Sequence, residues 1–169
     1  MINRFIGLRI ALPALIFAAA ADAQPARALE AGDRAPMFSI TTDQGKHIGP
    51  NTPGRGLLVL NFWETPCVPC VAELPSLSAF AARFASDPVV VVAVSEDEDA
   101  QKYSRFLHDR HVILETYRDP ARRISKSFGT LQFPETYLIQ NGRIVRKVVG
   151  GIDWMNDEIS SFVHKLVAP

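Results

Sequence analysis

Two continuous apolar runs, residues 57–63 and 89–94, constrain the fold of this chain more than any other feature. Asn61 is the only polar residue in either run. The lack of polar–apolar alternation is typical of strands that are buried on both faces, as in parallel sheets. Apolar side chains at helical spacing follow each run, in residues 71–84 and 97–110. This strand–helix–strand–helix order predicts an α/β domain whose central sheet is parallel in part.

Two hairpins are predicted on either side of this central region. Residues 37–48 contain the turn sequence Asp43-Gln44-Gly45 between short apolar segments, which predicts a small N-terminal β-hairpin. Residues 136–149 contain Asn141-Gly142, the strongest short hairpin signal, and this pair of strands would give the sheet an antiparallel edge. The remaining predicted elements are a strand at 112–117 and helices at 120–128 and 159–166.

The first 23 residues have the pattern of a secretory signal peptide. Arg4 and Arg9 precede an uncharged run at residues 10–21, and Ala21-Asp22-Ala23 places small side chains where a signal peptidase cuts. The apolar run is shorter than the roughly 20 residues that span a bilayer comfortably. An uncleaved anchor remains the alternative.

The rest of the chain, residues 24–169, is predicted to be a single soluble domain in the periplasm or another extracytoplasmic compartment. The full sequence of 169 residues has 18 basic and 18 acidic side chains and therefore no net formal charge. Because no basic stripe is present, nucleic acid and anionic membranes are not expected partners. We expect a monomer.

The only two cysteines, Cys67 and Cys70, lie between the first buried run and the helix that follows it. A thiol at a helix N-terminus faces unpaired amide groups and the positive end of the helix dipole, which favour an anion. A cysteine of pKa near 8.5 is only about 3% thiolate at pH 7, whereas a pKa of about 7 makes roughly half of it thiolate. Two cysteines three residues apart can also close a disulfide. The spacing therefore predicts an activated nucleophile with a resolving partner.

Two other roles for the pair are weaker. A disulfide that closes so short a loop contributes roughly 2 kcal/mol, against about 3 kcal/mol for a 15-residue loop, so a purely structural clip gains little. A zinc site needs two more ligands, and the four histidines show no paired spacing, so we expect no metal.

A hydroperoxide-reducing enzyme is the nearest competing enzymatic interpretation. Its usual signature has Thr three residues and Pro seven residues before the attacking cysteine. Those positions hold Glu64 and Leu60 before Cys67, and Cys67 and Trp63 before Cys70. The pattern does not support peroxidase activity.

An ordered set of motifs resembles the TlpA/ResA-type thioredoxin-like thiol–disulfide oxidoreductases, a redoxin or AhpC/TSA-like group of bacterial proteins that work outside the cytoplasm. The matching segments are residues 31–38, Leu60-Asn61-Phe62-Trp63, Cys67-Val68-Pro69-Cys70, Glu73-Leu74-Pro75, residues 133–137 and Asn141-Gly142. The resemblance implies a thioredoxin-like fold, in which helices flank a mixed central β-sheet. It also implies reduction of protein disulfides without a cofactor.

The resemblance also implies roles for particular residues. Cys67, Cys70 and Glu73 would be the catalytic residues, with Glu73 close to the cysteines and able to exchange a proton with Cys70. Pro134 matches the family's cis-proline, beside which a substrate strand pairs. An apolar groove that recognises an extended peptide is implied around Val68, Pro69, Phe133 and Pro134, with Pro66 at its edge. A solvated glutamate on the helix surface is the plainer alternative for Glu73.

Three positions depart from the patterns of related proteins. Pro66 stands where the family usually has an aromatic residue, which would alter the substrate groove. Asn61 stands where cytosolic thioredoxins carry a buried acid, so a proton relay would depend on Glu73 or water. Glu64 would oppose formation of the thiolate if it faces Cys67.

The sequence thus predicts thiol–disulfide exchange with exported proteins, such as apocytochrome c or the cysteines of copper sites. A membrane-bound thiol reductant is the implied electron donor. A Cu(I)-binding metallochaperone is the alternative function, because two thiolates suit a soft cation. The absence of a His or Met ligand within the motif counts against it. The net direction of electron flow depends on the reduction potential, which the sequence does not fix.

Overall fold

The two apolar runs form adjacent parallel strands at the centre of the fold. In the computed structural model, which describes residues 27–168, β3 (Leu57–Trp63) is buried along its whole length. It pairs with β4 (Val89–Ser95), so that Leu57 lies beside Val89 and Trp63 beside Ser95. The prediction of two buried parallel strands is confirmed. The predicted signal peptide lies outside the described residues.

Three further strands complete a five-stranded mixed sheet in the order β5-β4-β3-β6-β7. β5 (Glu115–Arg118) is parallel to β4, whereas β6 (Glu135–Gln140) is antiparallel to β3 and β7 (Arg143–Val149) is antiparallel to β6. Asn141 and Gly142 both have positive φ angles, 51° and 70°, as expected for the two-residue turn between β6 and β7. The predicted antiparallel edge is confirmed.

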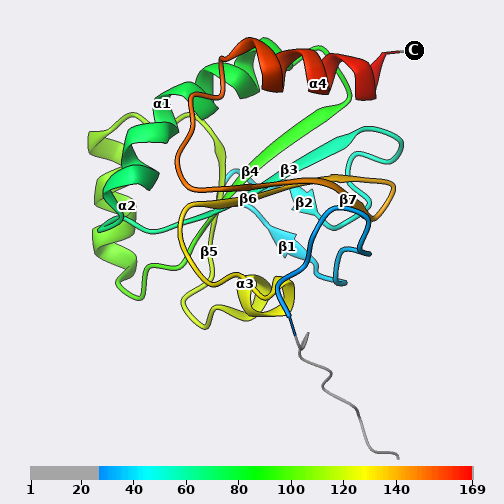
Figure 1. Cartoon of the computed structure of the whole chain (residues 1–169). Coiled ribbons are helices and arrows are strands. Elements are labelled where there is room, and N and C mark those ends of the chain that lie inside the picture. The colour runs from blue at the N-terminus through cyan, green and yellow to red at the C-terminus, as the bar shows by residue number, and fades with distance from the viewer. Residues whose placement is uncertain (1–26, 169) are drawn as a thin grey trace, which may run out of the picture.

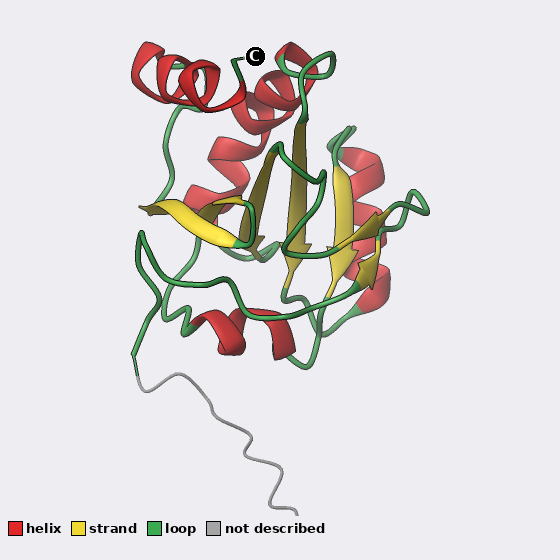
Figure 2. Ribbon diagram, turned by 90° about the vertical axis from the view of Figure 1, so that its right-hand side faces the viewer, coloured by secondary structure: helices red, strands yellow, loops and turns green. Residues whose placement is uncertain are grey.

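Helices cover both faces of this sheet, as Figures 1 and 2 show. The described helices are α1 (Val68–Arg83), α2 (Ala100–Asp109), α3 (Arg123–Phe128) and α4 (Asp157–Val167). Side chains of α1, α2 and α4 contribute to one apolar core, and those of α3 to the other. The predicted N-terminal hairpin, β1 (Ile40–Thr41) with β2 (His47–Ile48), forms a separate two-stranded sheet on the α3 side.

The alternating side chains of β3 connect the two cores. Val59 and Trp63 belong to the core under α1 and α4, whereas Leu60 and Phe62 belong to the core on the α3 side. Because β3 is anchored on both faces, the point where it ends and α1 begins is held firmly. The cysteine pair lies at this point.

Two helices begin later than predicted, and in both an acidic side chain before the helix accepts a hydrogen bond from an amide of its first turn. The helix expected from residue 97 begins at Ala100, because the side chain of Asp99 accepts hydrogen bonds from the amides of Gln101 and Lys102. The short helix expected from residue 120 begins at Arg123, where Asp119 accepts from the amide of Ile124. None of the helices within residues 27–168 is long and apolar enough to cross a membrane.

Candidate active site

Cys67 is the N-cap residue of α1. Its backbone is extended, with φ −81° and ψ 103°, and its Sγ accepts a hydrogen bond from the amide of Cys70 at 3.2 Å. Pro69 lies in the first turn of the helix, where a missing amide hydrogen has no cost. The prediction that the first cysteine lies at a helix N-terminus is confirmed.

The two cysteines form a disulfide, with an S–S distance of 2.03 Å and a Cα–Cα distance of 5.2 Å. They differ in exposure: Cys67 is partly exposed, whereas Cys70 is fully buried. A partner sulfur can therefore reach Cys67 directly, and Cys70 only through Cys67. This asymmetry fits an attacking role for Cys67 and a resolving role for Cys70.

Glu73 is buried in the second turn of α1 and is 3% exposed. Its Oε1 accepts a hydrogen bond from Asn61 Nδ2 at 2.8 Å, and its Oε2 accepts from Trp154 Nε1 at 3.1 Å and the amide of Ile152 at 3.2 Å. Burial raises the pKa of this carboxyl group, and the three hydrogen bonds partly oppose that rise. The interpretation of Glu73 as a solvated surface glutamate is wrong.

A cleft of about 410 Å³ adjoins Glu73, between the start of α1 and the loop that follows β7. Pro69 and Ser76 line it on the helix side and Gly151 and Ile152 on the loop side. A Cβ atom at Gly151 would stand 2.9 Å from the carbonyl oxygen of Pro69, so only glycine allows the loop to approach the helix this closely. The cleft gives solvent a path toward the region of Glu73.

The loop before β6 lies at the same edge of the sheet as the cysteines. Phe62 pairs with Glu135, which brings Pro134 to the end of β3. The Phe133–Pro134 peptide bond is cis, as the resemblance implied. Pro134 is buried and its carbonyl accepts from the amide of Gly150 at 2.9 Å. Neither backbone polar group of Phe133 has a hydrogen-bond partner within residues 27–168.

The other predicted groove residues are exposed around the disulfide. Val68 is 79% exposed, Pro66 and Pro69 are exposed, and Phe133 is half-buried. Trp63 lies beneath this surface, fully buried, and its ring packs against that of Phe106 with centroids 5.4 Å apart. Trp63 therefore supports the site by packing beneath it.

Glu64, which the sequence singled out, belongs to a larger group of charged residues at the edge of the sheet where the cysteines lie, and the other members were not predicted. Glu64, Glu96 and Asp119 each directly follow one of the three parallel strands, and the carboxyl ends of these strands share one edge of the sheet. The sequence signal that could have revealed this group is that each of these charged residues follows closely after a predicted strand. Arg122 joins the group: its Nη2 lies 3.3 Å from Glu64 Oε2, and its Nε lies 3.5 Å from Glu96 Oε2. The carboxylate of Glu64 is thus paired with a cation.

The approach to Cys67 is also fixed by Asp97. The side chain of Asp97 accepts hydrogen bonds from the backbone amide of Thr65 and, at 2.6 Å, from its hydroxyl group. The hydroxyl group of Ser95 donates to the same carboxylate at 2.7 Å. Asp97 therefore ties the segment before Cys67 to the end of β4.

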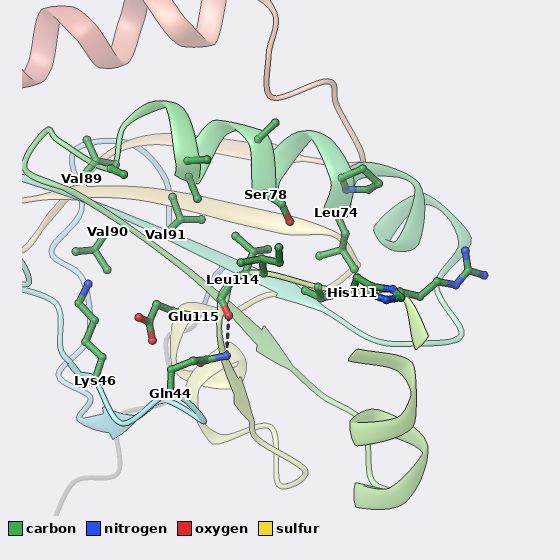
Figure 3. Close-up of a pocket in the computed structure, with 18 of the residues that line it drawn as sticks. Gln44, Lys46, Leu74, Ser78, Val89, Val90, Val91, His111, Leu114 and Glu115 are labelled. Atoms are coloured by element: carbon green, nitrogen blue, oxygen red, sulfur yellow. Dashed lines mark hydrogen bonds between the residues drawn. The ribbon is translucent and has the colours of Figure 1, made fainter. Parts of the chain in front are cut away.

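A second cavity is lined by neither cysteine. It measures about 940 Å³ and lies between α1, β4 and the segment that leads into β5 (Figure 3). Leu74, Val91 and Leu114 are among its apolar walls, and Gln44 donates a hydrogen bond to the carbonyl of Leu114 at its edge. Within residues 27–168, no three His, Cys, Asp or Glu side chains are grouped so as to hold a metal ion.

Comparison with known sequences connects this geometry with a family. The sequence model of the AhpC/TSA family matches residues 31–148. The thiol–disulfide oxidoreductase ResA of Bacillus subtilis is 31% identical over 133 residues, which are 74% of this chain and 74% of that protein. The ResA protein of Bacillus thuringiensis is 26% identical over 140 residues, or 82% of this chain and 79% of the relative.

Solved structures support the fold. A candidate thiol:disulfide interchange protein DsbE from Chlorobium tepidum superposes with a TM-score of 0.73, at 23% identity, over 82% of this chain and 99% of that one. StoA from Bacillus subtilis gives a TM-score of 0.64, at 23% identity, over 70% and 91% of the two chains. The thioredoxin-like fold predicted from the motifs is confirmed.

Proposed function

Because the chain belongs to the AhpC/TSA family, and within it to the ResA thiol–disulfide oxidoreductases, we propose that it is an exported reductase of protein disulfides. The observation that carries this proposal is the Cys67–Cys70 pair, which begins α1 with one accessible and one buried sulfur. A helix N-terminus stabilises the thiolate of Cys67, and the spacing places its resolving partner within bonding distance.

The reaction transfers two electrons from the cysteine pair to a target disulfide. The thiolate of Cys67 attacks one target sulfur, forms a mixed disulfide and expels the other target sulfur as a thiolate, which takes up a proton. Cys70 then loses its proton and attacks Cys67, which releases the second target thiolate and leaves the Cys67–Cys70 disulfide. A membrane-bound dithiol reductant supplies two electrons and two protons to restore the pair.

Glu73 is proposed as the group that accepts the proton of Cys70. It lies three residues beyond Cys70 on α1, and the two side chains are both buried. Because burial raises its pKa, Glu73 is a better proton acceptor than an exposed glutamate would be. The adjoining cleft offers a route by which the proton reaches solvent.

The substrate is proposed to be an extended segment of an exported protein, such as an apocytochrome c or a protein with copper-binding cysteines. The backbone of Phe133 offers a free donor and acceptor for pairing with such a segment. Val68, Pro69 and Pro66 supply exposed apolar contacts around the disulfide. Export itself rests on the signal pattern of residues 1–23.

Reduction of insulin by the dithiol-reduced protein tests the enzymatic function. We expect activity without added metal, complete loss in Cys67→Ser, and a trapped mixed disulfide in Cys70→Ser. Stoichiometric Cu(I) binding without disulfide exchange would instead identify the protein as a copper carrier. Equilibration with a dithiol buffer tests the direction. A reductase in an oxidising compartment should have a potential below about −200 mV, closer to that of thioredoxin than to that of DsbA.

Export is tested by producing the full chain in a Gram-negative host. We expect the protein in the periplasmic fraction with Gln24 as its first residue. Retention in the membrane with an intact N-terminus would support the uncleaved anchor instead.

A further inference from the structure

Arg122 contacts three different parts of the redox edge of the sheet. Its Nη2 bonds to Glu64 in the segment before Cys67, and its Nε faces Glu96 at the end of β4. Its guanidinium also lies over the ring of Phe133, 5.8 Å from the centroid. One side chain thus joins the approach to the cysteines with the loop that precedes Pro134.

The backbone of Arg122 is held in an uncommon conformation. Its φ of 54° and ψ of 34° are in the left-handed region, where a side chain is strained and glycine is not. Its amide donates to the carbonyl of Asp119 at 2.9 Å, so the turn that orients it is well defined. A strained residue that persists at a reaction site suggests that its side chain has a role there. The neighbouring Arg123 is exposed and has no polar partner within residues 27–168.

Glu96 contacts the guanidinium of Arg122 from the buried side of the site. Its side chain is 0% exposed, and neither carboxylate oxygen has a hydrogen-bond partner within the described part of the chain. Arg122 is the cation nearest to it. The charged groups that influence the pKa of Glu96 are Glu64 from the segment before α1, and Asp119 and Arg122 from the loop after β5. The Glu96 carboxyl group is shielded from water, whereas the Arg122 side chain is 45% exposed, so the contact holds the guanidinium from its buried side.

We propose that Arg122 is a positioning residue of the redox site, which holds the segment before Cys67 and the loop before Pro134 in their reactive arrangement. The link to Cys67 is short: the carbonyl oxygen of Glu64 accepts a hydrogen bond from the amide of Cys67 at 3.2 Å. Fixing the Glu64 side chain therefore fixes the backbone that begins α1. This inference rests on the proposed exchange function and adds a residue to its machinery.

Arg122 also balances charge next to the nucleophile. Without its cation, Glu64 would leave uncompensated negative charge in the segment that precedes Cys67. A negative charge there favours the protonated thiol of Cys67. Removal of the guanidinium should therefore raise the pKa of Cys67 and weaken the contact with Phe133 at the same time.

Arg122→Gly is the most informative variant, because glycine adopts the left-handed conformation without strain. Arg122→Lys keeps the charge but not the planar contact with Phe133, and Arg123→Ala is a matched control on the adjacent exposed position. The reduced proteins are compared by the pKa of the Cys67 thiol, read from thiolate absorbance in a Cys70→Ser background. In the Cys70-containing forms, kcat and KM are measured for a disulfide-bonded peptide.

We expect Arg122→Gly to keep or raise the urea midpoint, to raise the Cys67 pKa by about 0.5 to 1 unit, and to lower kcat more than it raises KM. Arg122→Lys should restore the pKa but only part of kcat, and Arg123→Ala should match the parent. The proposal is overturned if Arg122→Gly leaves both pKa and kcat at the values of Arg123→Ala. An Arg122→Gly protein that fails to fold would also overturn it, because the side chain would then be structural.

Measurement of the Cys67 thiol pKa distinguishes a failure of this proposal from a failure of the proposed function. The pKa is measured without any disulfide substrate. If the parent protein reduces no disulfide, the proposed function fails, while the effect of Arg122 on Cys67 is still observed or excluded.

Discussion

Glu73 offers the sharpest test of how the site is built, because its carboxylate satisfies three buried donors at once. In Glu73→Ala, the indole of Trp154 and the amide of Ile152 lose their acceptor, whereas Asn61 keeps its hydrogen bond to Thr136 Oγ1 at 2.8 Å. Two orphaned buried donors at about 1–3 kcal/mol each should lower the free energy of unfolding by about 2–6 kcal/mol at pH 5.

Glu73→Gln should be milder. The amide oxygen of the new side chain can still accept from Trp154 and Ile152, and its NH₂ group would face Asn61. A rotation of the Asn61 amide lets Oδ1, which has no partner within the described residues, accept that hydrogen bond, but it turns Nδ2 to a position without an acceptor. With one buried donor orphaned instead of two, we expect a loss of about 1–3 kcal/mol at pH 5.

The pH dependence of these losses has a definite sign. The folded state raises the pKa of Glu73, so its stabilising contribution is complete below the unfolded pKa and is lost as the pH rises through the folded pKa. Both variants should therefore be closer to the parent protein at pH 8 than at pH 5. Urea unfolding of the oxidised proteins at the two pH values measures this. A Glu73→Ala protein as stable as the parent at pH 5 would refute the reasoning.

Three further predictions concern the surroundings of the site. Phe128→Ala removes a fully buried ring packed against Phe62 and should cost about 3–5 kcal/mol in urea unfolding; a loss below about 1 kcal/mol would contradict the packing. Asp97→Asn gives Thr65 a poorer hydrogen-bond acceptor and should slow insulin reduction. Glu98→Gln, at an exposed neighbouring position, is the control. Equal rates in the two variants would show that the Asp97–Thr65 contact does not support the reaction. Glu96→Gln removes a buried carboxyl group. Burial raises the pKa of this group from 4.5 to about 7. The protonated Glu96 of the parent protein contributes stability that is lost as the pH rises from 4.5 to about 7, so the variant should become more stable relative to the parent between pH 5 and pH 8. A difference in the free energy of unfolding that does not change with pH would contradict this prediction.

Much of the fold could be predicted from local patterns. The run at residues 57–63 coincides with β3, and the Asn141-Gly142 turn joins β6 to β7 as expected. These signals are readable because each strand is buried on both faces or follows a turn with a fixed geometry. The position of Cys67 at the start of α1 followed from the same order of elements.

The charged cluster could not be predicted in the same way. Glu64 and Arg122 are 58 positions apart, and their contact depends on how β3 and β5 are arranged in the sheet. The burial of Glu73 likewise depends on Trp154, which reaches it from the loop between β7 and α4. Such pairings arise from tertiary structure, and the sequence contains only the general signal that charged residues at the ends of parallel strands gather at one edge.

The proposed exchange depends above all on Cys67 being an accessible thiolate that the start of α1 stabilises. The most direct measurement is the rate at which iodoacetamide alkylates each cysteine of the reduced protein as a function of pH, with the labelled residue identified by mass spectrometry. We expect Cys67 to be labelled first, with a midpoint clearly below the value of about 8.5 for a free cysteine. Preferential labelling of Cys70, or a Cys67 midpoint at or above that value, would contradict it.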